Sequence, residues 1–330
     1  MTYICSVGLA IPDFNISQQT VKNLVRTLFQ DHARRINRLL PVFDNAAIEN
    51  RQFVVDEDWF LTHHSFEEKN ALYVQNAIDY SVKAVQQCLS NDHFLHEKVP
   101  FEAVDLIVFV SSTGIATPSI DARIMNKLPF RSDVIRMPLW GLGCAGGAMG
   151  LSRAYDWLKA NPKQTALVIC CELCSLTFQK DDMSKSNVVG TALFADGIAA
   201  TLLVGDASPY QKNVKIKKPK ITYTNSFTEK DSEDVMGWNV TDQGLEVIFS
   251  KSIPHLVDTI WKEHVKDTLQ KLDITSDEID SYIAHPGGKK VLEAMCQSMQ
   301  LSMDKLKFSY EVLRQHGNMS SATVFYVLKK

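Results

Sequence analysis

A single cysteine among several glycines is the residue of this chain best suited to nucleophilic chemistry. The segment 138–150 contains Cys144 and five glycines. Glycines would allow a substrate to approach the sulfur closely. A helix is predicted over 151–160, ending before Pro162, so Cys144 lies at or near a helix N-terminus. Such a position favours a thiolate, the nucleophilic form of cysteine. The alternative is a small apolar side chain buried at a tight packing turn.

Two further turns carry side chains that can assist a thiolate. His285 opens the turn His285-Pro286-Gly287-Gly288, and Asn318 follows a glycine in Gly317-Asn318-Met319. Each lies beside a predicted strand end or helix start. A lone histidine or asparagine in a turn is usually structural. The presence of both in one chain with a cysteine turn favours a shared catalytic site.

Two other patterns are weaker indications of a functional site. Cys171 and Cys174 have the C-x-x-C spacing of a metal or redox site. There is no second pair and no histidine cluster nearby, so we interpret them as apolar packing and predict no metal site. The arginines at 34, 35 and 38 form a basic stretch, which is usually a solvated face but would also suit a phosphate-bearing ligand.

Length and composition describe an ordinary globular protein. The chain has 330 residues, of which 45% are hydrophobic and 22% charged, with a net charge of -3. This charge gives no indication of a nucleic-acid or membrane-surface binder. No apolar run is long enough to span a membrane, and the N-terminus does not resemble a signal peptide. Seven cysteines without a disulfide pattern favour the cytoplasm.

Alternating strands and helices must position these turns. We predict strands over 2–10, 104–110, 165–170, 198–205, 221–223 and 280–284, and helices over 66–89, 151–160, 253–272 and 323–328. Near-continuous apolar strands are typical of sheets covered on both faces. A polar stretch at 206–220 connects two halves. The pattern predicts a layered α/β architecture with helices between and outside two sheets.

Four motifs in order resemble the type III polyketide synthases, the chalcone synthase-like enzymes of the thiolase superfamily. They are Gly141-Leu142-Gly143-Cys144-Ala145-Gly146-Gly147, Ala192-Leu193-Phe194-Ala195-Asp196-Gly197, His285-Pro286-Gly287-Gly288 and Gly317-Asn318-Met319-Ser320-Ser321-Ala322. The spacing between Cys144, His285 and Asn318 is also similar to that of the family. The resemblance covers nearly the whole chain.

The resemblance implies a fold and an assembly. The fold is the thiolase-like layered αβαβα architecture, built from two duplicated halves. Residues 1–210 form the half with the nucleophilic cysteine, and residues 211–330 the half with the histidine and asparagine. The implied assembly is a homodimer, with each active site between the two halves of a subunit.

The resemblance also implies roles for single residues. The catalytic residues are Cys144, which is acylated, and its partners His285 and Asn318. The substrate-binding residues are the gating pair Phe194 and Phe249, the cavity-lining Thr177 and Ser320, and Thr117, which falls where the family sends a side chain into the neighbouring subunit's cavity.

The reaction implied is a repeated condensation. An acyl group passes from an acyl-CoA starter to Cys144, and the enolate formed when malonyl-CoA loses carbon dioxide attacks the thioester. We expect the pKa of Cys144 to be lowered by the helix N-terminus and a cationic His285. Asn318 would stabilise the enolate as a neutral donor. No cofactor is expected. The product would be a pyrone- or phenol-type polyketide, such as an alkylpyrone or a triketide pyrone.

One departure from the family and several alternatives accompany this interpretation. Family members continue for a few dozen residues beyond the equivalent of position 330, which implies that this chain lacks a C-terminal segment that shapes the cavity. The alternatives are a non-catalytic homologue that only binds acyl-CoA or a partner, a ketoacyl synthase III-like fatty-acid enzyme, a papain-like protease, and a coenzyme A redox or disulfide protein. The motif around the cysteine disfavours the protease, and the lack of a second cysteine pair disfavours the redox protein.

Overall fold

A six-stranded sheet forms the centre of the protein. The computed structural model describes residues 1–215, 218–250 and 252–330. The strands lie in the order β5-β4-β6-β7-β1-β8. Strand β4 pairs in parallel with β5 and β6, and the remaining neighbours are antiparallel. The bounds are β1 Thr2–Ala10, β4 Leu106–Ser111, β5 Ile135–Trp140, β6 Thr165–Leu173, β7 Asp196–Gly205 and β8 Lys220–Ile221.

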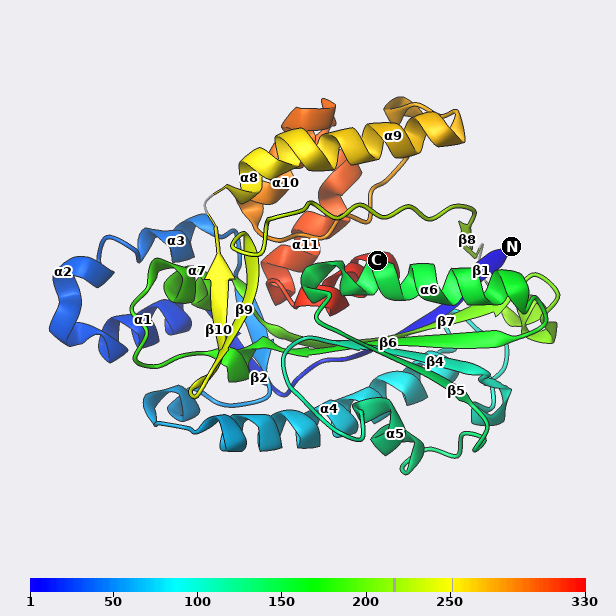
Figure 1. Ribbon diagram of the computed structural model, residues 1–330, viewed down its shortest axis with the longest axis horizontal. Coiled ribbons are helices and arrows are strands. Elements are labelled where there is room, and N and C mark those ends of the chain that lie inside the picture. The colour runs from blue at the N-terminus through cyan, green and yellow to red at the C-terminus, as the bar shows by residue number, and fades with distance from the viewer. Residues whose placement is uncertain (216–217, 251) are drawn as a thin grey trace.

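Helices cover both faces of this sheet. Every residue of β4, β6 and β7 is buried. Helix α4 (Phe66–Leu89) packs across β1 and β7 on one face, and α6 (Gly146–Ala160) and α12 (Thr323–Lys329) lie on the other (Figure 1). This arrangement explains why these strands are continuous apolar runs in the sequence, since neither face meets water.

Helix α4 forms over the residues that the sequence predicts. Helix α4 begins after a capping box, in which the Ser65 hydroxyl accepts from the backbone N–H of Glu68 and the Glu68 carboxylate accepts from that of Ser65. This satisfies two N–H groups at the helix start. Shorter elements complete this part of the chain: α1 Gln18–Leu28, α2 Ala33–Ile36, α3 Pro41–Asn45, α5 Ile120–Met125, α7 Lys185–Leu193, β2 Phe14–Ser17 and β3 Asn50–Phe53.

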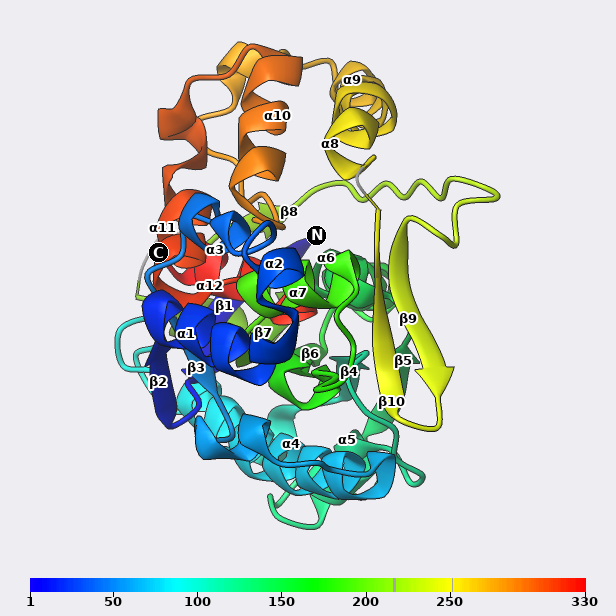
Figure 2. The same cartoon turned by 90° about the vertical axis from the view of Figure 1, so that its left-hand side faces the viewer.

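The C-terminal part begins with a hairpin that lies apart from the central sheet (Figure 2). Its strands, β9 (Met236–Thr241) and β10 (Gly244–Phe249), pair only with each other in the described part of the chain. The helix predicted over 253–272 is confirmed as α8 (Ile253–Leu256), a π-helical turn (Val257–Trp261) and α9 (Lys262–Leu272). Helices α10 (Lys289–Met299) and α11 (Lys307–His316) follow. No described helix has the length and apolar character needed to cross a membrane.

The strand predicted over 280–284 is wrong. This segment has no strand assignment, and Ile283 is 49% exposed. The backbone N–H of Tyr282 donates to the carbonyl of Lys305, which lies in the 3₁₀ turn Met303–Leu306. A strand is stabilised by a ladder to a neighbouring strand, and no described strand lies beside this segment. The apolar pattern alone therefore does not produce a strand here.

Candidate active site

Cys144 lies in a tight turn that leads directly into α6. The 3₁₀ turn Gly143–Ala145 joins β5 to the helix, which confirms the predicted position of Cys144 near a helix N-terminus. Gly143 adopts a φ of +50°, which favours glycine. Its N–H donates to the Ser112 hydroxyl at 3.0 Å. The turn is thus fastened to the carboxyl end of β4, where loops of open α/β sheets commonly form ligand sites.

Asn318 connects the turn that carries His285 to Cys144. Its fully buried side chain places Oδ1 4.0 Å from the Cys144 Sγ, and its Nδ2 donates to the Gly287 carbonyl at 3.3 Å. The same Oδ1 accepts from the Ser320 N–H at 2.9 Å. These bonds hold the amide in one orientation. The predicted set of Cys144, His285 and Asn318 is therefore linked through Asn318.

The backbone of Asn318 is itself tied to the turn that carries Phe194. Its N–H donates to the Leu193 carbonyl, and its carbonyl accepts from the Ala195 N–H, both at 2.9 Å. These two bonds form a short parallel bridge between segments far apart in the sequence. The backbone of the candidate amide is therefore bonded directly to both neighbours of the candidate gate residue.

His285 lies in the turn that Asn318 contacts, with both ring nitrogens buried. Neither nitrogen has a hydrogen-bond partner among the described residues. Gly287 follows in a turn closed by a 3.0 Å bond from its N–H to the His285 carbonyl. Buried ring nitrogens are normally hydrogen-bonded, so an unpaired imidazole here is able to receive a ligand group or a proton.

The acid–base expectation for this site is contradicted. Burial raises the pKa of Cys144 to about 11, although bonds from Ser320 and Asn318 act in the opposite direction. Burial also lowers the pKa of His285 to about 4. Desolvation disfavours each charge by itself because no contact pairs the two groups. Burial therefore favours a neutral thiol at Cys144 and a neutral imidazole at His285, and a neutral imidazole can accept a proton.

Two aromatic side chains from the hairpin flank Phe194. The ring of Phe249 lies 6.5 Å from that of Phe194, and the ring of Trp238 lies 5.9 Å away. Thr177 and Phe194 both line a cavity of about 40 Å³, and the Thr177 side chain is buried. The structure thus places the two predicted gate residues in contact, with Thr177 next to one of them.

Ser320 and Thr117 occupy different surroundings. Ser320 is 5% exposed, has a φ of +48° and follows the Asn318 turn closely. Thr117 is exposed in the loop between β4 and α5. That loop is fastened to the edge strand by a bond from Trp140 Nε1 to the Gly114 carbonyl. Within one subunit Thr117 therefore lies on the surface beside β5.

Cys171 and Cys174 are buried, as expected for apolar packing. They are 0% and 4% exposed and lie at the end of β6. Burial raises the pKa of both thiols. Among the described residues, no group of three or more histidines, cysteines, aspartates and glutamates is arranged to hold a metal ion.

Sequence reasoning missed Glu172, a buried carboxyl group beneath the site. It accepts from the Ser112 N–H at 3.0 Å and from the Ser321 hydroxyl at 2.5 Å. It therefore connects the strand end that holds the Cys144 turn to the segment after Asn318. Burial raises its pKa to about 7. Its signal was an acidic residue inside an otherwise apolar strand.

Arg51 is a second residue that the sequence analysis missed. Its guanidinium is fully buried and donates to the carbonyls of Thr191 and Phe194 and to the Gln18 Oε1. A Cβ added at Gly317 would lie 2.8 Å from its side chain. Arg51 therefore packs under both the Phe194 turn and the Asn318 turn. No local pattern distinguishes it from a surface arginine.

Gly147→Ala is expected to disturb the site strongly. A Cβ at this position would lie 2.3 Å from the Ser321 carbonyl oxygen, so the segment after Asn318 would have to shift away from α6. Overpacking of this kind costs about 1–3 kcal/mol. Gly150→Ala is a matched control in the same helix, since its nearest neighbours are valine methyl groups at 3.0 and 3.1 Å. Chemical denaturation measures the unfolding free energy of both variants. An equal loss of unfolding free energy in the two would contradict the packing argument.

Glu172→Gln is expected to change the pH dependence of stability. Because the folded-state pKa is raised from 4.5 to about 7, the protonated carboxyl contributes stability that is complete below pH 4.5 and is lost as pH rises through about 7. The glutamine variant has no such loss. The melting temperature of the wild type should therefore fall relative to the variant over this interval. Parallel pH profiles would show that folding does not raise the pKa of Glu172.

Both halves of the chain match one protein family. The N-terminal domain of the chalcone and stilbene synthases matches residues 1–208, and the C-terminal domain matches residues 222–330. A Bacillus subtilis (strain 168) protein provisionally named chalcone synthase is 48% identical over 329 residues, covering 100% of this chain and 90% of that protein. A 1,3,6,8-tetrahydroxynaphthalene synthase of Streptomyces peucetius is 32% identical, covering 99% and 85%.

Solved structures agree with this assignment. The 1,3,6,8-tetrahydroxynaphthalene synthase of Streptomyces coelicolor A3(2), a bacterial type III polyketide synthase, superposes with a TM-score of 0.90 at 26% identity, covering 99% of this chain and 90% of that one. The type III domain of Steely1 from Dictyostelium gives 0.88 at 25% identity, covering 99% and 91%. The predicted thiolase-like α/β fold is thereby confirmed. The chain belongs to the chalcone and stilbene synthase family of type III polyketide synthases.

Proposed function

We propose that this chain condenses malonyl-CoA units onto an acyl-CoA starter through a thioester on Cys144, giving pyrone- or phenol-type polyketides. The observation that supports this most directly is the Asn318 amide, which lies 4.0 Å from the Cys144 sulfur and also bonds the turn of His285. The neutral amide thus lies between a nucleophile and the turn that carries an imidazole unpaired among the described residues. These groups can carry out acyl transfer followed by enolate chemistry, because they supply a nucleophile, a base for its activation and a donor for developing negative charge.

The first step is loading of the starter. The Cys144 sulfur attacks the acyl-CoA carbonyl, the bond to the coenzyme A sulfur breaks, and the acyl group becomes a thioester on Cys144. The neutral imidazole of His285 takes the thiol proton and returns it to the departing coenzyme A thiolate. Because burial lowers the pKa of His285, its imidazole is neutral and has a ring nitrogen without a proton, which a proton acceptor needs.

The second step is decarboxylation and condensation. Malonyl-CoA releases carbon dioxide, and the electron pair of the broken bond becomes an enolate whose negative charge lies on the thioester oxygen. The Asn318 Nδ2 has two hydrogens, one of which is bonded to the Gly287 carbonyl, so the other is available to that oxygen. The enolate carbon attacks the Cys144 thioester and releases the thiolate. Every electron pair comes from the thiolate or the enolate, so these steps need no added cofactor.

The aromatic contacts suggest how the site separates its two substrates. Phe194 lies between the hairpin rings of Phe249 and Trp238 and the segment that holds Asn318. We propose that Phe194 and Phe249 gate the entry of coenzyme A esters and that Thr177 and Ser320 line the cavity behind them. Use of the exposed arginines at 34, 35 and 38 by a phosphate-bearing ligand stays a prediction.

We further propose that two subunits associate through the edge strand β5. Ile135 and Trp140 on this strand are 48% and 53% exposed, and an open apolar edge invites pairing. A homodimer formed here would bring the exposed Thr117 loop against the partner. Residues 1–210 and 211–330 would form its two duplicated thiolase-like halves. Light scattering that gives the mass of a monomer would contradict this assembly.

A cytoplasmic location is proposed from the state of the cysteines. All seven, each within the described residues, are free thiols. Free thiols persist in a reducing compartment. Fractionation of cells that produce the protein tests this proposal.

Product analysis tests the proposed function. The protein is incubated with malonyl-CoA and a panel of acyl-CoA starters, and the products are separated by chromatography and identified by mass. Polyketides that disappear in Cys144→Ala are the expected result. Absence of any product with every starter would favour a homologue that only binds acyl-CoA, and a single-extension product bound for fatty-acid synthesis would favour a ketoacyl synthase III-like enzyme.

A further inference from the structure

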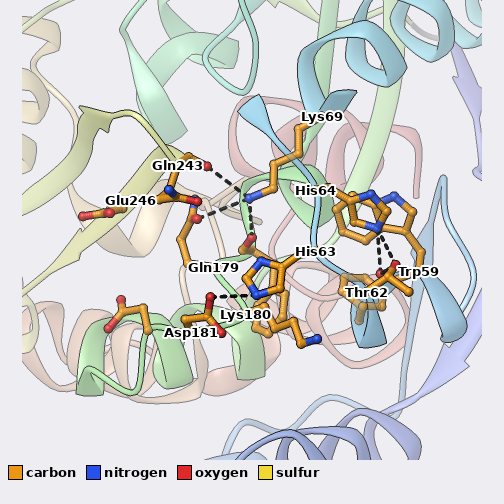
Figure 3. A pocket seen from close by; sticks show the side chains of 13 residues that line it. Trp59, Thr62, His63, His64, Lys69, Gln179, Lys180, Asp181, Gln243 and Glu246 are labelled. Carbon is orange, nitrogen blue, oxygen red and sulfur yellow. Dashed lines mark hydrogen bonds and ion pairs between the residues drawn. The ribbon is translucent and has the colours of Figure 1, made fainter. Parts of the chain in front are cut away.

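A nearly buried lysine lies in a surface pocket beside the hairpin. The pocket has a volume of about 340 Å³, and Lys69, in the first turn of α4, contributes to its wall (Figure 3). Lys69 is only 7% exposed, and its Nζ donates to the carbonyls of Phe178 and Gln243 and to the Gln179 Oε1, at 3.1, 3.1 and 3.2 Å. An ammonium has three hydrogens, so all are used within the protein. Lys69 therefore fastens these segments together.

Gln179 extends this connection in two directions. Its Nε2 donates to the Thr177 carbonyl at 3.1 Å and to the Leu245 carbonyl at 3.3 Å. The backbone carbonyl of Gln179 accepts from the Asn187 Nδ2 at 2.7 Å. Because Lys69 holds the Gln179 Oε1, it also fixes the direction in which the amide nitrogen points. Lys69 and Gln179 thus form one node that joins the start of β10 to the segment at Thr177.

The hairpin depends on such contacts for its position. Strands β9 and β10 pair only with each other within the described residues, and an isolated two-stranded hairpin is marginally stable at best. The turn end of the hairpin is held by Lys69 through Gln243, whereas Phe249 at the far end of β10 packs against Phe194. Because β10 joins these two ends, a displacement at the turn end would also move Phe249.

We propose that Lys69 is a positioning residue for chain extension, fixing through Gln179 and Gln243 the hairpin that carries Phe249. The inference rests on the proposed function, because it assigns Lys69 to the extension steps of that same site. Loading of Cys144 needs the nucleophile and its proton acceptor, neither of which contacts the node. Extension needs the growing chain to be held correctly behind the gate, so it depends on the hairpin.

Lys69→Met tests this because it keeps the apolar stem and removes all three donors. Two backbone carbonyls and the Gln179 amide lose their partner, and water from the adjoining pocket can replace it without holding the segments in place. We expect acyl-enzyme formation close to that of the wild type, with product per acylated enzyme reduced roughly ten- to a hundredfold and shifted towards shorter chains. Unchanged yield and chain lengths in the folded variant would overturn the proposal.

Lys305→Met is the matched control. Lys305 also donates to two backbone carbonyls, those of Ser276 and Asp277, but these lie outside the hairpin. It should keep the wild-type ratio of extended product to acyl-enzyme. If both lysine variants lose extension equally, the effect is general destabilisation and the positioning role is wrong. If Lys69→Met does not fold, Gln179→Leu, which removes the other half of the node, carries the test with the same expected result.

Hydrogen exchange provides a readout that does not depend on product. Amides of 243–249 should exchange faster in Lys69→Met than in the wild type and in Lys305→Met. Unchanged exchange would overturn the proposal. A wild-type protein that forms no product from any starter would instead remove the proposed function, and the exchange result would still decide whether Lys69 holds the hairpin.

Discussion

Asn318→Asp is expected to lower the rate of malonyl-CoA decarboxylation by about a hundred- to a thousandfold, the usual cost of losing one oxyanion donor. The amide lies 4.0 Å from the Cys144 sulfur in a fully buried position. An aspartate there loses the bond from Nδ2 to the Gly287 carbonyl and adds a negative charge. That charge repels both the malonyl carboxylate and the enolate oxygen. Release of carbon dioxide from malonyl-CoA is the measurement.

The rate of Cys144 acylation and a second variant show whether the added charge causes the loss of decarboxylation. The starter carbonyl carries no net charge, so acylation of Cys144 should be reduced much less than decarboxylation. Asn318→Ala removes the donor without adding charge. Its rate of malonyl-CoA decarboxylation should therefore lie between those of the wild type and the aspartate variant. Equal carbon dioxide release from the wild type and a folded Asn318→Asp would remove Asn318 from the reaction.

Arg51→Met is expected to cost about 3–5 kcal/mol of unfolding free energy, the range for deleting one partner from a buried charged network. The guanidinium is fully buried and donates to the carbonyls of Thr191 and Phe194. Burial lowers its pKa to about 9, and the nearby Asp196 opposes this, so it remains charged at neutral pH. The substitution leaves two buried carbonyls unpaired and removes the positive charge near the buried Asp196. Chemical denaturation measures the loss.

A surface arginine provides the control for this prediction. Arg314 on α11 makes a 2.7 Å ion pair with Glu49, but its side chain is 41% exposed. Arg314→Met should change stability little, since exposed ion pairs contribute little. A similar loss of unfolding free energy in both variants would show that the burial of Arg51 does not cause the larger effect expected for it. The Arg51 variant should also lose product more than acyl-enzyme, because Arg51 supports the turn of Phe194.

The parts of the fold predicted from sequence are those that local patterns determine. Helix α4 begins after Ser65 and ends at Leu89 because a capping box and an apolar face specify it. Strand β4 is buried on both faces, and its run of apolar residues already indicated this. The turns of Cys144, His285 and Asn318 contain glycines that mark them. Their assembly around Asn318 rests on contacts across 174 positions, which the co-occurrence of the three turns and the family resemblance suggested in advance but no local pattern determines.

The remaining features depend on neighbours that are distant in sequence. The apolar segment 280–284 forms no strand because a strand needs a partner beside it. The pKa of Cys144 is set mainly by burial, which a helix start alone does not reveal. Glu172 and Arg51 act through bonds to segments from other parts of the chain. The hairpin β9–β10 was not predicted, although a short turn ending in Gly244 separates its strands.

Acyl-enzyme mass spectrometry tests the central claim most directly. The protein is mixed with acyl-CoA in the absence of malonyl-CoA, digested and mapped by peptide mass, with Cys144→Ala as the control. We expect the added acyl mass on the peptide that contains Cys144, none on the peptides of the other six cysteines, and none in the variant. An acyl group on Cys171 or Cys174 ahead of Cys144, or no acyl group with any starter, would contradict it.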